Sequence, residues 1–305
     1  MKRLVPPIKI QGIKTKLIDF ISSHTLHNDG KRRIEPFMGS WVVGFNLAPK
    51  QAIFADTNPH TINFYSGLNH QVYNHLDIKH FLEYEWKILS EKWEVHYKFI
   101  RERFNQEHNP LDFLFLNRAC FNGMIRFNRK GWFNVPFCKK PDRFTPAYIT
   151  KITNQVKNIQ TLMKQNNREF ICQDFRKTLS NITSSDFIYC DPPYIGRHVD
   201  YYDSRNEEDE QDLHDLLVNN SSSFVVSTRH SNDFRSNDYL ENLRNDCDIV
   251  TTQHFYYLWG KETNRNPITE ALILRHQPHM ISLHNTDYIL AHPQKIKTPS
   301  LFTIE

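Results

Sequence analysis

Short apolar runs alternate with amphipathic stretches over the first part of the chain. Residues 33–46 predict a strand, a glycine turn and a helix, and residues 52–58 predict a second strand, which closes on Asp56. Ahead of them, Leu17 and Ile18 begin an amphipathic helix. Strands that alternate with helices in this way favour an α/β protein with a parallel sheet.

The same alternation returns after residue 166. Asn206 is expected to cap a helix, because three acids follow it in the first turn, where the helix dipole favours negative charge. Arg229 and His230 are placed in a turn that follows a strand. The predicted strands are residues 170–174, 187–190, 223–228, 255–258 and 270–274, and the last two are expected to form a closing antiparallel pair.

The middle of the chain breaks this alternation. Residues 81–104 predict a helix, and residues 128–131 predict the tip of a hairpin. From Asn117 to Arg143 there are seven Arg or Lys residues against one acid, Asp142, and five Phe or Trp side chains lie among them. Cations bind phosphate, and aromatic, Arg or Asn side chains can enter a groove, so the stretch favours a nucleic-acid surface. A solvated basic hairpin with a small aromatic core is the competing interpretation.

Composition narrows the class of protein. With 305 residues and 39% hydrophobic side chains, the chain is long and apolar enough for one large globular domain or two smaller ones. A net charge of +4 is only mildly basic and says little about partners by itself. We expect no signal peptide and no membrane span, and the five scattered cysteines favour reduced thiols in a cytoplasmic protein over a zinc site.

The string Asp191-Pro192-Pro193-Tyr194 directly follows a predicted buried strand. Two prolines lock φ and remove two amide donors, so the turn is rigid and its carbonyls have no regular partner. The Asp191 carboxylate and the Pro192 carbonyl therefore form a pair of acceptors that matches an amino group with two N–H donors, and Tyr194 offers a flat face to a planar ring. This arrangement predicts a site for an exocyclic amine such as that of adenine or cytosine. A plain strand-ending turn is the alternative.

The N-terminal strands have the pattern of a nucleoside-binding half. The glycine turn after the first strand lets backbone approach a ligand, and Asp56 is placed to take ribose hydroxyls. Lys14, at the entrance of the first helix, is placed to hold an anionic group such as a carboxylate. An ordinary strand-turn-helix unit stays open as an alternative, because the glycine spacing differs from the dinucleotide fingerprint.

Three blocks together resemble the Dam-type (α-group) DNA adenine N6-methyltransferases. They are residues 35–37 with the glycine loop, residues 116–137 with the ending Phe-Asn-Val-Pro-Phe, and residues 191–194. The similarity runs from about Lys9 to Leu274. It implies a Rossmann-like methyltransferase sheet that uses S-adenosyl-L-methionine and carries an inserted, mainly helical plus hairpin target-recognition domain.

The resemblance also implies domain limits and residue roles. The methyltransferase domain would comprise residues 1–65 and 166–275, the recognition insert residues 66–165, and a tail or linker residues 276–305. S-adenosyl-L-methionine would be held by Ile10, Lys14, Glu35, Phe37, Gly39, Asp56, Asp174 and Asp191. Double-stranded DNA would be contacted by Lys9, Phe121, Asn122, Met124, Arg126, Asn128, Arg129, Lys130 and Pro136.

An enzyme of this kind methylates a base that it has flipped out of the duplex. By resemblance, Phe121 would enter the base stack, Asn122 would brace the disturbed bases, and Arg126 would read a guanine by a bidentate contact. A site that contains GAT is therefore the expected target. Asp191, Pro192 and Tyr194 would hold the flipped adenine, and no metal is needed.

Two stretches depart from or refine the family pattern. Trp41 stands where the family has a small residue, and an indole there is expected to fill space beside the cofactor, so a DNA-binding relative that has lost methyl transfer is the alternative function. Residues 195–202 resemble adenine methylases of restriction-modification systems, with His198 touching the flipped base or a phosphate, or serving only as a structural histidine of the loop. A cognate restriction endonuclease or a second methyltransferase is therefore an expected partner. Methylation of RNA or of a protein glutamine is a third, disfavoured reading, because related turns for those substrates begin with Asn.

Overall fold

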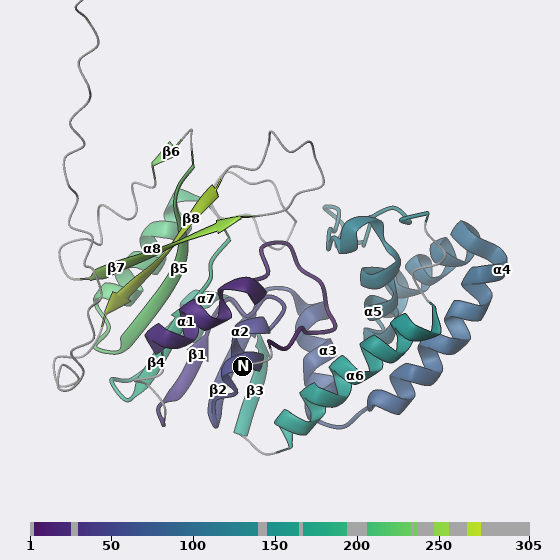
Figure 1. The fold of residues 1–305 in the computed structure, drawn as a ribbon, viewed down its shortest axis with the longest axis horizontal. Coiled ribbons are helices and arrows are strands. Elements are labelled where there is room, and N and C mark those ends of the chain that lie inside the picture. Colours follow the sequence, from purple (N-terminus) through teal and green to yellow (C-terminus); the bar gives the residue numbers. More distant parts are fainter. Residues whose placement is uncertain are drawn as a thin grey trace, which may run out of the picture.

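A computed structural model describes residues 3–25, 30–139, 145–164, 167–193, 206–232, 235–236, 247–255 and 267–275 (Figure 1). Its centre is one sheet with the order β3-β2-β1-β4-β5-β8-β7, and the two-residue β6 pairs with β5. The strands are β1 Arg32–Glu35, β2 Gln51–Asp56, β3 Asn167–Cys172, β4 Asp186–Cys190, β5 Ser223–Asn232, β6 Arg235–Ser236, β7 Asp248–Phe255 and β8 Pro267–Arg275. Strands β1 to β5 run parallel to one another, whereas β8 runs antiparallel to both β5 and β7.

Helices cover both faces of this sheet. They are η1 Thr15–Leu17, α1 Ile18–Thr25, α2 Val42–Leu47, α3 Pro59–Asn69, α4 His75–Glu107, α5 Pro110–Ala119, η3 Phe121–Gly123, α6 Pro146–Met163, α7 Phe175–Leu179 and α8 Glu207–Val218. Helices α1 and α2 pack on the face that carries Phe187 and Tyr189 of β4, whereas α7 and α8 pack on the face that carries Ile188. The alternation along β4 thus separates the two cores, as expected for a strand buried on both sides.

The predicted parallel sheet is confirmed, with corrections near the far end of the chain. Arg229 and His230, which were placed in a turn, lie within β5, because that strand continues past residue 228 and pairs Arg229 with Glu270 of β8. The strand that pairs with β8 is β7 at residues 248–255, not 255–258. Residues 256–266 lie outside the described residues. Pairing across the sheet decided these limits, and local sequence carries no signal for it.

The chain between β2 and β3 forms a block of helices that lies to one side of the sheet (Figure 1). Its helices α3 to α6 share one continuous hydrophobic core with the sheet, which runs from Phe54 of β2 through Phe64 to Phe104 and Phe113. The predicted helix at 81–104 is confirmed as part of α4, whose backbone breaks at Trp93, where φ is 49° and ψ is −123°. The shared core fixes the helical block against the sheet.

Buried charges tie the two arms of α4 to α5. Glu85 Oε2 lies 2.7 Å from His96 Nε2, and Glu85 Oε1 accepts from Arg103 Nη2 at 2.9 Å. Arg103 also donates to both carboxylate oxygens of Asp112 in α5, at 2.8 Å and 2.5 Å. Burial opposes ionisation of Glu85, but the hydrogen bonds from His96 and Arg103 outweigh it and hold the pKa of Glu85 below its usual value. This network clamps α4 across its break.

No helix in the part of the chain that the structure describes is long and apolar enough to cross a membrane.

Candidate active site

The carboxyl ends of four neighbouring strands bring the predicted acids to one edge of the sheet. Glu35 ends β1, Asp56 ends β2, Asp174 follows β3 by two residues, and Asp191 directly follows β4. Because these four strands are parallel and adjacent in the sheet, their carboxyl ends lie side by side. In open α/β sheets, this edge is where ligands bind.

Asp191 is held by a buried lysine from the start of the chain. Lys14 Nζ lies 3.0 Å from Asp191 Oδ1, and the Lys14 side chain is only 3% exposed, against 24% for Asp191. Burial raises the pKa of Asp191, the ammonium of Lys14 opposes that rise, and the charge of Glu270 on β8 adds to it. The ion pair fixes one carboxylate oxygen. Pro192 is buried, whereas Tyr194 and His198 lie outside the described residues.

A second buried ion pair lies next to Asp191. Arg33 Nε is 2.5 Å from Glu35 Oε1, and the guanidinium of Arg33 lies 4.9 Å from the ring centre of Tyr189. Burial raises the pKa of Glu35, Arg33 opposes the shift, and the negative charge of Asp191 adds to it. The pKa of Tyr189 is also raised by burial, and next by Asp191, so its phenol keeps its proton. Glu35, predicted to face the cofactor, thus has its carboxylate engaged inside the protein.

Asp56 joins the loop after β1 to the loop after β2. Its Oδ2 accepts from the Gly39 amide at 2.8 Å and its Oδ1 from the Asn58 amide at 2.9 Å. Gly39 has φ +52°, a left-handed conformation in which a side chain would be strained. Burial raises the pKa of Asp56, while the amides of Asn58 and Gly39 oppose that rise. The carboxylate fixes the glycine loop and still has lone pairs that can accept from a ligand hydroxyl.

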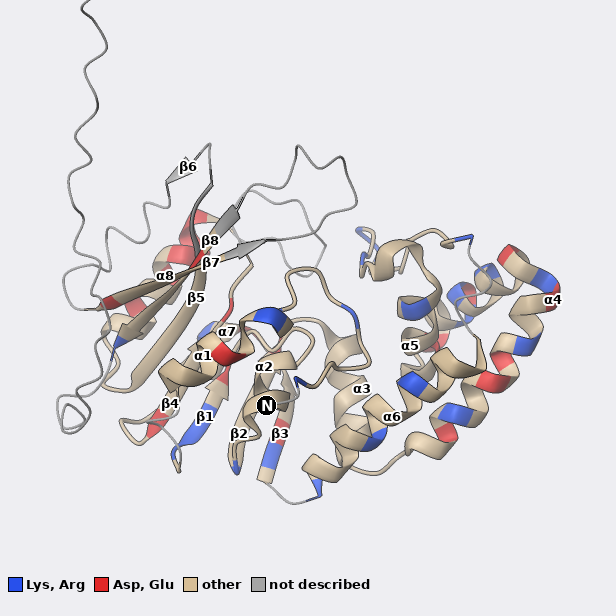
Figure 2. Ribbon diagram, viewed as in Figure 1, with Lys and Arg blue, Asp and Glu red and all other residues tan. Residues whose placement is uncertain are grey.

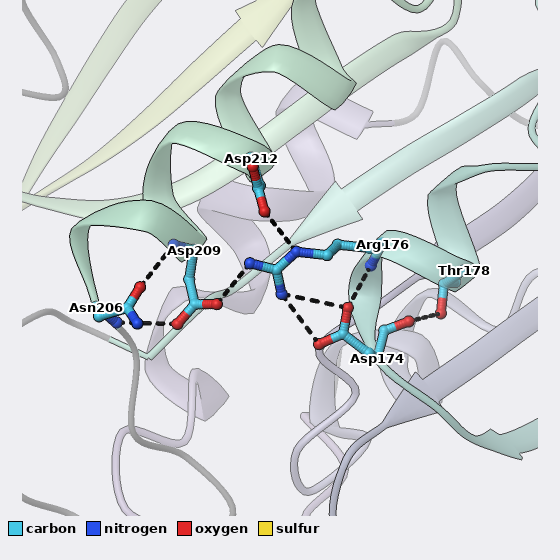
Figure 3. Close-up of polar contacts among 6 residues, drawn as sticks. All are labelled: Asp174, Arg176, Thr178, Asn206, Asp209 and Asp212. Atoms are coloured by element: carbon cyan, nitrogen blue, oxygen red, sulfur yellow. Dashed lines mark hydrogen bonds and ion pairs between the residues drawn. The ribbon is translucent and has the colours of Figure 1, made fainter.

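Asp174 is fixed at the start of α7 (Figure 3). Its carboxylate accepts from the Arg176 amide at 2.8 Å, which caps the helix, and Arg176 reaches across to α8. There, Arg176 Nη2 lies 2.7 Å from Asp209 Oδ1 and Nε lies 2.6 Å from Asp212 Oδ2 (Figure 3). Asn206 forms the predicted cap, as a capping box with Asp209. Arg176 thus links the acid that follows β3 to the first turns of the helix that follows the Asp191 turn.

Two aromatic rings lie beside Asp174. Phe37, from the loop after β1, packs against Phe175 of α7 with ring centres 5.4 Å apart. Phe37 is only half-buried, and the side chain of Asp174 is 45% exposed. An aromatic surface next to a fixed carboxylate can receive a flat heterocycle that carries an amino group.

Trp41 does not lie where the sequence alone suggested. Its backbone has φ 62°, and its indole is fully buried, with ring centres 5.3 Å from Phe54, 5.4 Å from Tyr65 and 5.1 Å from Phe170. Phe54 precedes Asp56 by two residues, so the indole extends down the sheet, away from the carboxyl edge. The ring is therefore part of the core beneath the glycine loop, which argues against an obstruction beside the cofactor.

Gly44 provides the room for this indole. A Cβ atom at Gly44 would overlap the ring of Phe54 and lie 2.6 Å from Trp41 Nε1. Real Cβ atoms do not approach other atoms so closely, so a side chain at this position would displace one of the two rings. The glycine three residues after Trp41 is the sequence signal that could have indicated where the indole goes.

The basic stretch after α5 forms the predicted hairpin. Isolated bridges pair Cys120 with Phe137 and Phe127 with Phe133, and the Gly131 amide donates to the Asn128 carbonyl at 2.8 Å at the tip. Among the predicted DNA contacts, the exposed ones are Phe121, Asn122, Arg126, Arg129, Lys130 and Pro136, and the partly buried ones are Lys9, Met124 and Asn128. Phe121 is 51% exposed, which is unusual for a phenylalanine next to a packed core. Lys and Arg residues lie on the segment that follows α5, α4 carries residues of both signs, and acids gather on α8 (Figure 2).

Lys9 is held against the hairpin by Asn117. The Asn117 side chain accepts from the Lys9 amide at 2.8 Å and donates to the Lys9 carbonyl at 2.9 Å. It therefore makes the two backbone hydrogen bonds that a neighbouring β-strand would make. A Cβ atom at Gly123 would lie 2.6 Å from Lys9 Cδ, so Gly123 leaves room for the lysine stem. The amino-terminal segment and the hairpin therefore meet at one place, although more than 100 residues separate them.

Sequence reasoning missed Arg33 and Tyr189. Arg33 lies two residues before Glu35 in β1, and Tyr189 of β4 lies two residues before Asp191, which directly follows that strand. Because side chains alternate along a strand, this spacing places them on the same face as that acid, which was a usable signal. The pairing of Asn117 with Lys9 depends on a distant contact, and no local pattern indicates it.

These features define a Rossmann-like methyltransferase fold with an acid-Pro-Pro turn at the carboxyl edge of its sheet and a basic hairpin in its helical block. The model of the D12 class N6 adenine-specific DNA methyltransferases matches residues 11–258, and the chain belongs to that family. The resemblance seen in the three sequence blocks is therefore confirmed.

Named relatives agree with this family. The chain is 31% identical to a DNA N-6-adenine-methyltransferase of Escherichia phage P1, over 54% of this chain and 21% of that protein. It is 32% identical to a DNA adenine methylase of Vibrio cholerae, over 64% of this chain and 66% of that protein. It is 27% identical to the type II methyltransferase M.FokI of Planomicrobium okeanokoites, over 79% of this chain and 38% of that protein. The match thus spans less than two thirds of each of these three relatives.

Proposed function

We propose that this protein is a site-specific DNA adenine N6-methyltransferase, which moves the methyl group of S-adenosyl-L-methionine to a flipped adenine in double-stranded DNA. The observation that supports this most is the Asp191-Pro192 turn at the carboxyl edge of the sheet, where Lys14 fixes one oxygen of Asp191 at 3.0 Å. The exposed hairpin that carries Phe121 and Arg126 lies in the same chain and gives a surface for the duplex.

The residues at the edge fit the methyl donor. Asp56 can accept from ribose hydroxyls, and Asp174 with the rings of Phe37 and Phe175 can receive an adenine with its amino group. Lys14, Ile10 and the Phe37-to-Gly39 loop would hold the amino-acid end of the donor. Glu35, which is paired with Arg33, would lie behind the donor site at the end of β1. When bound, S-adenosyl-L-methionine supplies an electrophilic methyl group on a positively charged sulfur.

The acceptor pair of the turn would act on the adenine amine. The free oxygen of Asp191 and the carbonyl of Pro192 can each accept one N–H, which turns the nitrogen lone pair out of the ring system and toward the donor. The nitrogen must then lose a proton, and burial, which raises the pKa of Asp191, makes that carboxylate a better proton acceptor than an ordinary one. Tyr194 would stack on the base. No metal takes part in this scheme.

The hairpin would open the duplex and read its sequence. Half-exposed Phe121 would enter the stack, Asn122 would brace the neighbouring bases, and the other hairpin cations and Lys9 would contact phosphate or base edges. Arg126 would read a guanine, which discriminates by about 1–3 kcal/mol and makes a site with GAT our first expectation. In this scheme residues 66–165 are the recognition insert, residues 1–65 and 166–275 are the catalytic domain, and residues 276–305 are a tail.

The biological setting follows from the same proposal. A DNA methyltransferase of this class would work in the cytoplasm on the nucleoid, and the likeness to M.FokI supports a cognate restriction endonuclease or a second methyltransferase as partner.

Long-read sequencing of DNA from cells that express the protein tests the activity and the site together. We expect N6-methyladenine at one short sequence, and we expect Asp191→Ala to erase it while the protein still binds duplex DNA. A wild-type protein that is folded, binds duplex and leaves every adenine unmethylated would instead be the DNA-binding relative that has lost methyl transfer.

A further inference from the structure

Arg126 does not extend freely from the hairpin. Its Nε donates to Asn134 Oδ1 at 2.7 Å, and its Nη2 donates to the Asn134 carbonyl at 3.1 Å. The Asn134 amide in turn donates to the Arg126 carbonyl at 3.1 Å. One asparagine on the opposite arm therefore meets the guanidinium with its side chain and its backbone together.

These contacts occupy one edge of the guanidinium, and the other donors of this exposed side chain take no part in them. A guanidinium has five N–H donors in a rigid plane, and the contacts with Asn134 use Nε and one hydrogen of Nη2. Both hydrogens of Nη1 and the second hydrogen of Nη2 take no part in them. One of the Nη1 hydrogens and the remaining Nη2 hydrogen form the end of the guanidinium whose geometry meets O6 and N7 of guanine in the major groove.

Asn134 itself stands on a rigid support. Its neighbours Phe133 and Val135 are each only 1% exposed. The Phe133 amide donates to Asn105 Oδ1 at 2.7 Å, and Tyr97 donates to the Val135 carbonyl at 2.7 Å, so helix α4 holds this arm of the hairpin from both sides of Asn134. The exposed side chain of Arg126 is thus tied, through Asn134, to the core of the helical block.

We propose that Asn134 is a positioning residue that presets the guanidinium of Arg126 and so sets how strictly the protein selects a guanine. This inference rests on the proposed function, because it needs a methyltransferase whose hairpin reads DNA. In the free protein the long Arg126 side chain is already held in one orientation, so less rotamer entropy is lost when DNA binds, and a wrong base meets a donor pair that does not move to suit it.

The test uses a pool of duplexes with random bases around a single adenine, methylated by purified protein with S-adenosyl-L-methionine and read by sequencing. Four proteins are compared with wild type: Asn134→Ala, Asn134→Asp, Arg126→Ala and the control Asn154→Ala. Asn154 is an exposed asparagine on α6. Asn134→Ala loses the side-chain acceptor but keeps the backbone contact, whereas Asn134→Asp keeps an acceptor for Nε.

We expect Arg126→Ala to lose a guanine preference of about 5- to 150-fold at one position. At that same position Asn134→Ala should lose roughly 3- to 10-fold, as for a single hydrogen bond to a charged group that a backbone contact partly replaces. Preferences at the other positions and the melting temperature should not change. Asn134→Asp should restore the preference, and Asn154→Ala should behave as wild type.

Each other outcome has a distinct meaning. If Arg126→Ala relaxes the preference but Asn134→Ala leaves it at the wild-type value, Asn134 does not position Arg126 and the inference is wrong. A uniform fall at all sites with a lower melting temperature in Asn134→Ala would mean a structural role, which also refutes it. If Arg126→Ala keeps the preference, Arg126 is not the reader. If wild type methylates nothing, the proposed function itself fails.

Discussion

Replacement of Trp41 by glycine separates the two possible places of the indole. Glycine is the small residue of the family pattern at this position, so an indole that blocked the donor site would be removed and binding would improve. In the structure, however, the indole is fully buried among Phe54, Tyr65 and Phe170. Trp41→Gly should therefore create a cavity in the core and leave the donor site as it was.

The size of the effect follows from burial and backbone conformation. Emptying a fully buried tryptophan site costs about 3–5 kcal/mol of unfolding free energy. Trp41 has φ 62°, and release of a side chain from the left-handed region returns about 1–2 kcal/mol. The net loss for Trp41→Gly should then be roughly 1–4 kcal/mol.

Urea unfolding monitored by circular dichroism measures this loss, and calorimetric titration with S-adenosyl-L-methionine under native conditions measures donor affinity. Trp93→Gly is a matched control, because Trp93 also has a positive φ, of 49°, but is 50% exposed. That variant should be close to neutral. A Trp41→Gly protein as stable as wild type that binds the donor at least about tenfold more tightly, a gain of about 1.4 kcal/mol, would refute the buried placement.

Four further predictions address the core and the edge of the sheet. Gly44→Ala should destabilise wild type, but less so in a Trp41→Gly background, because the two sites share space; a double-mutant cycle in urea with no coupling would contradict this. Lys14→Gln should move the acid limb of the pH dependence of kcat to higher pH, because Lys14 opposes the burial that raises the pKa of Asp191; an unmoved limb would show that the ion pair does not tune this carboxylate. Burial lowers the pKa of His60 from 6.5 to about 4. As the pH falls, His60 therefore takes up its proton in the unfolded chain before it does so in the folded protein. Its contribution to the free energy of unfolding is fully present above pH 6.5, and about 3 kcal/mol of it is lost as the pH drops to 4. His60→Phe should remove this slope in thermal melts between those pH values. Cys172 is exposed and lies opposite Asp56 in the strand register, at the ends of β3 and β2. Bound S-adenosyl-L-methionine should therefore slow the alkylation of Cys172 by iodoacetamide and leave that of Cys138 unchanged, as measured by peptide mass spectrometry.

Much of the parallel sheet could be predicted because its signals are local. A strand such as Phe187-Ile188-Tyr189-Cys190 is apolar throughout, and Asn206 with Asp209 forms the cap that its sequence indicates. The acids that end β2 and β4 were also found, because an acid after an apolar run marks the carboxyl edge of a sheet.

What sequence could not supply was contact between distant segments. The length of β5 depends on pairing with β8, and the direction of the Trp41 indole depends on the space beside Gly44. The pairing of Lys14 with Asp191 joins positions 177 residues apart in the chain, as 191 − 14. Only the tertiary arrangement decides such contacts, because no local preference favours one partner over another.

The central claim is that the Asp191 turn presents two acceptors to an adenine amine beside a methyl donor. The most direct measurement incubates purified protein with S-adenosyl-L-methionine and duplex DNA, digests the DNA to nucleosides and determines them by mass spectrometry, for wild type and Asp191→Asn. We expect N6-methyl-2′-deoxyadenosine from the wild-type protein. The rate of its formation should fall by at least about 10²-fold in Asp191→Asn, as for removal of one proton-accepting group. Methylated cytosine in place of adenine, or equal adenine methylation by both proteins, would contradict the account.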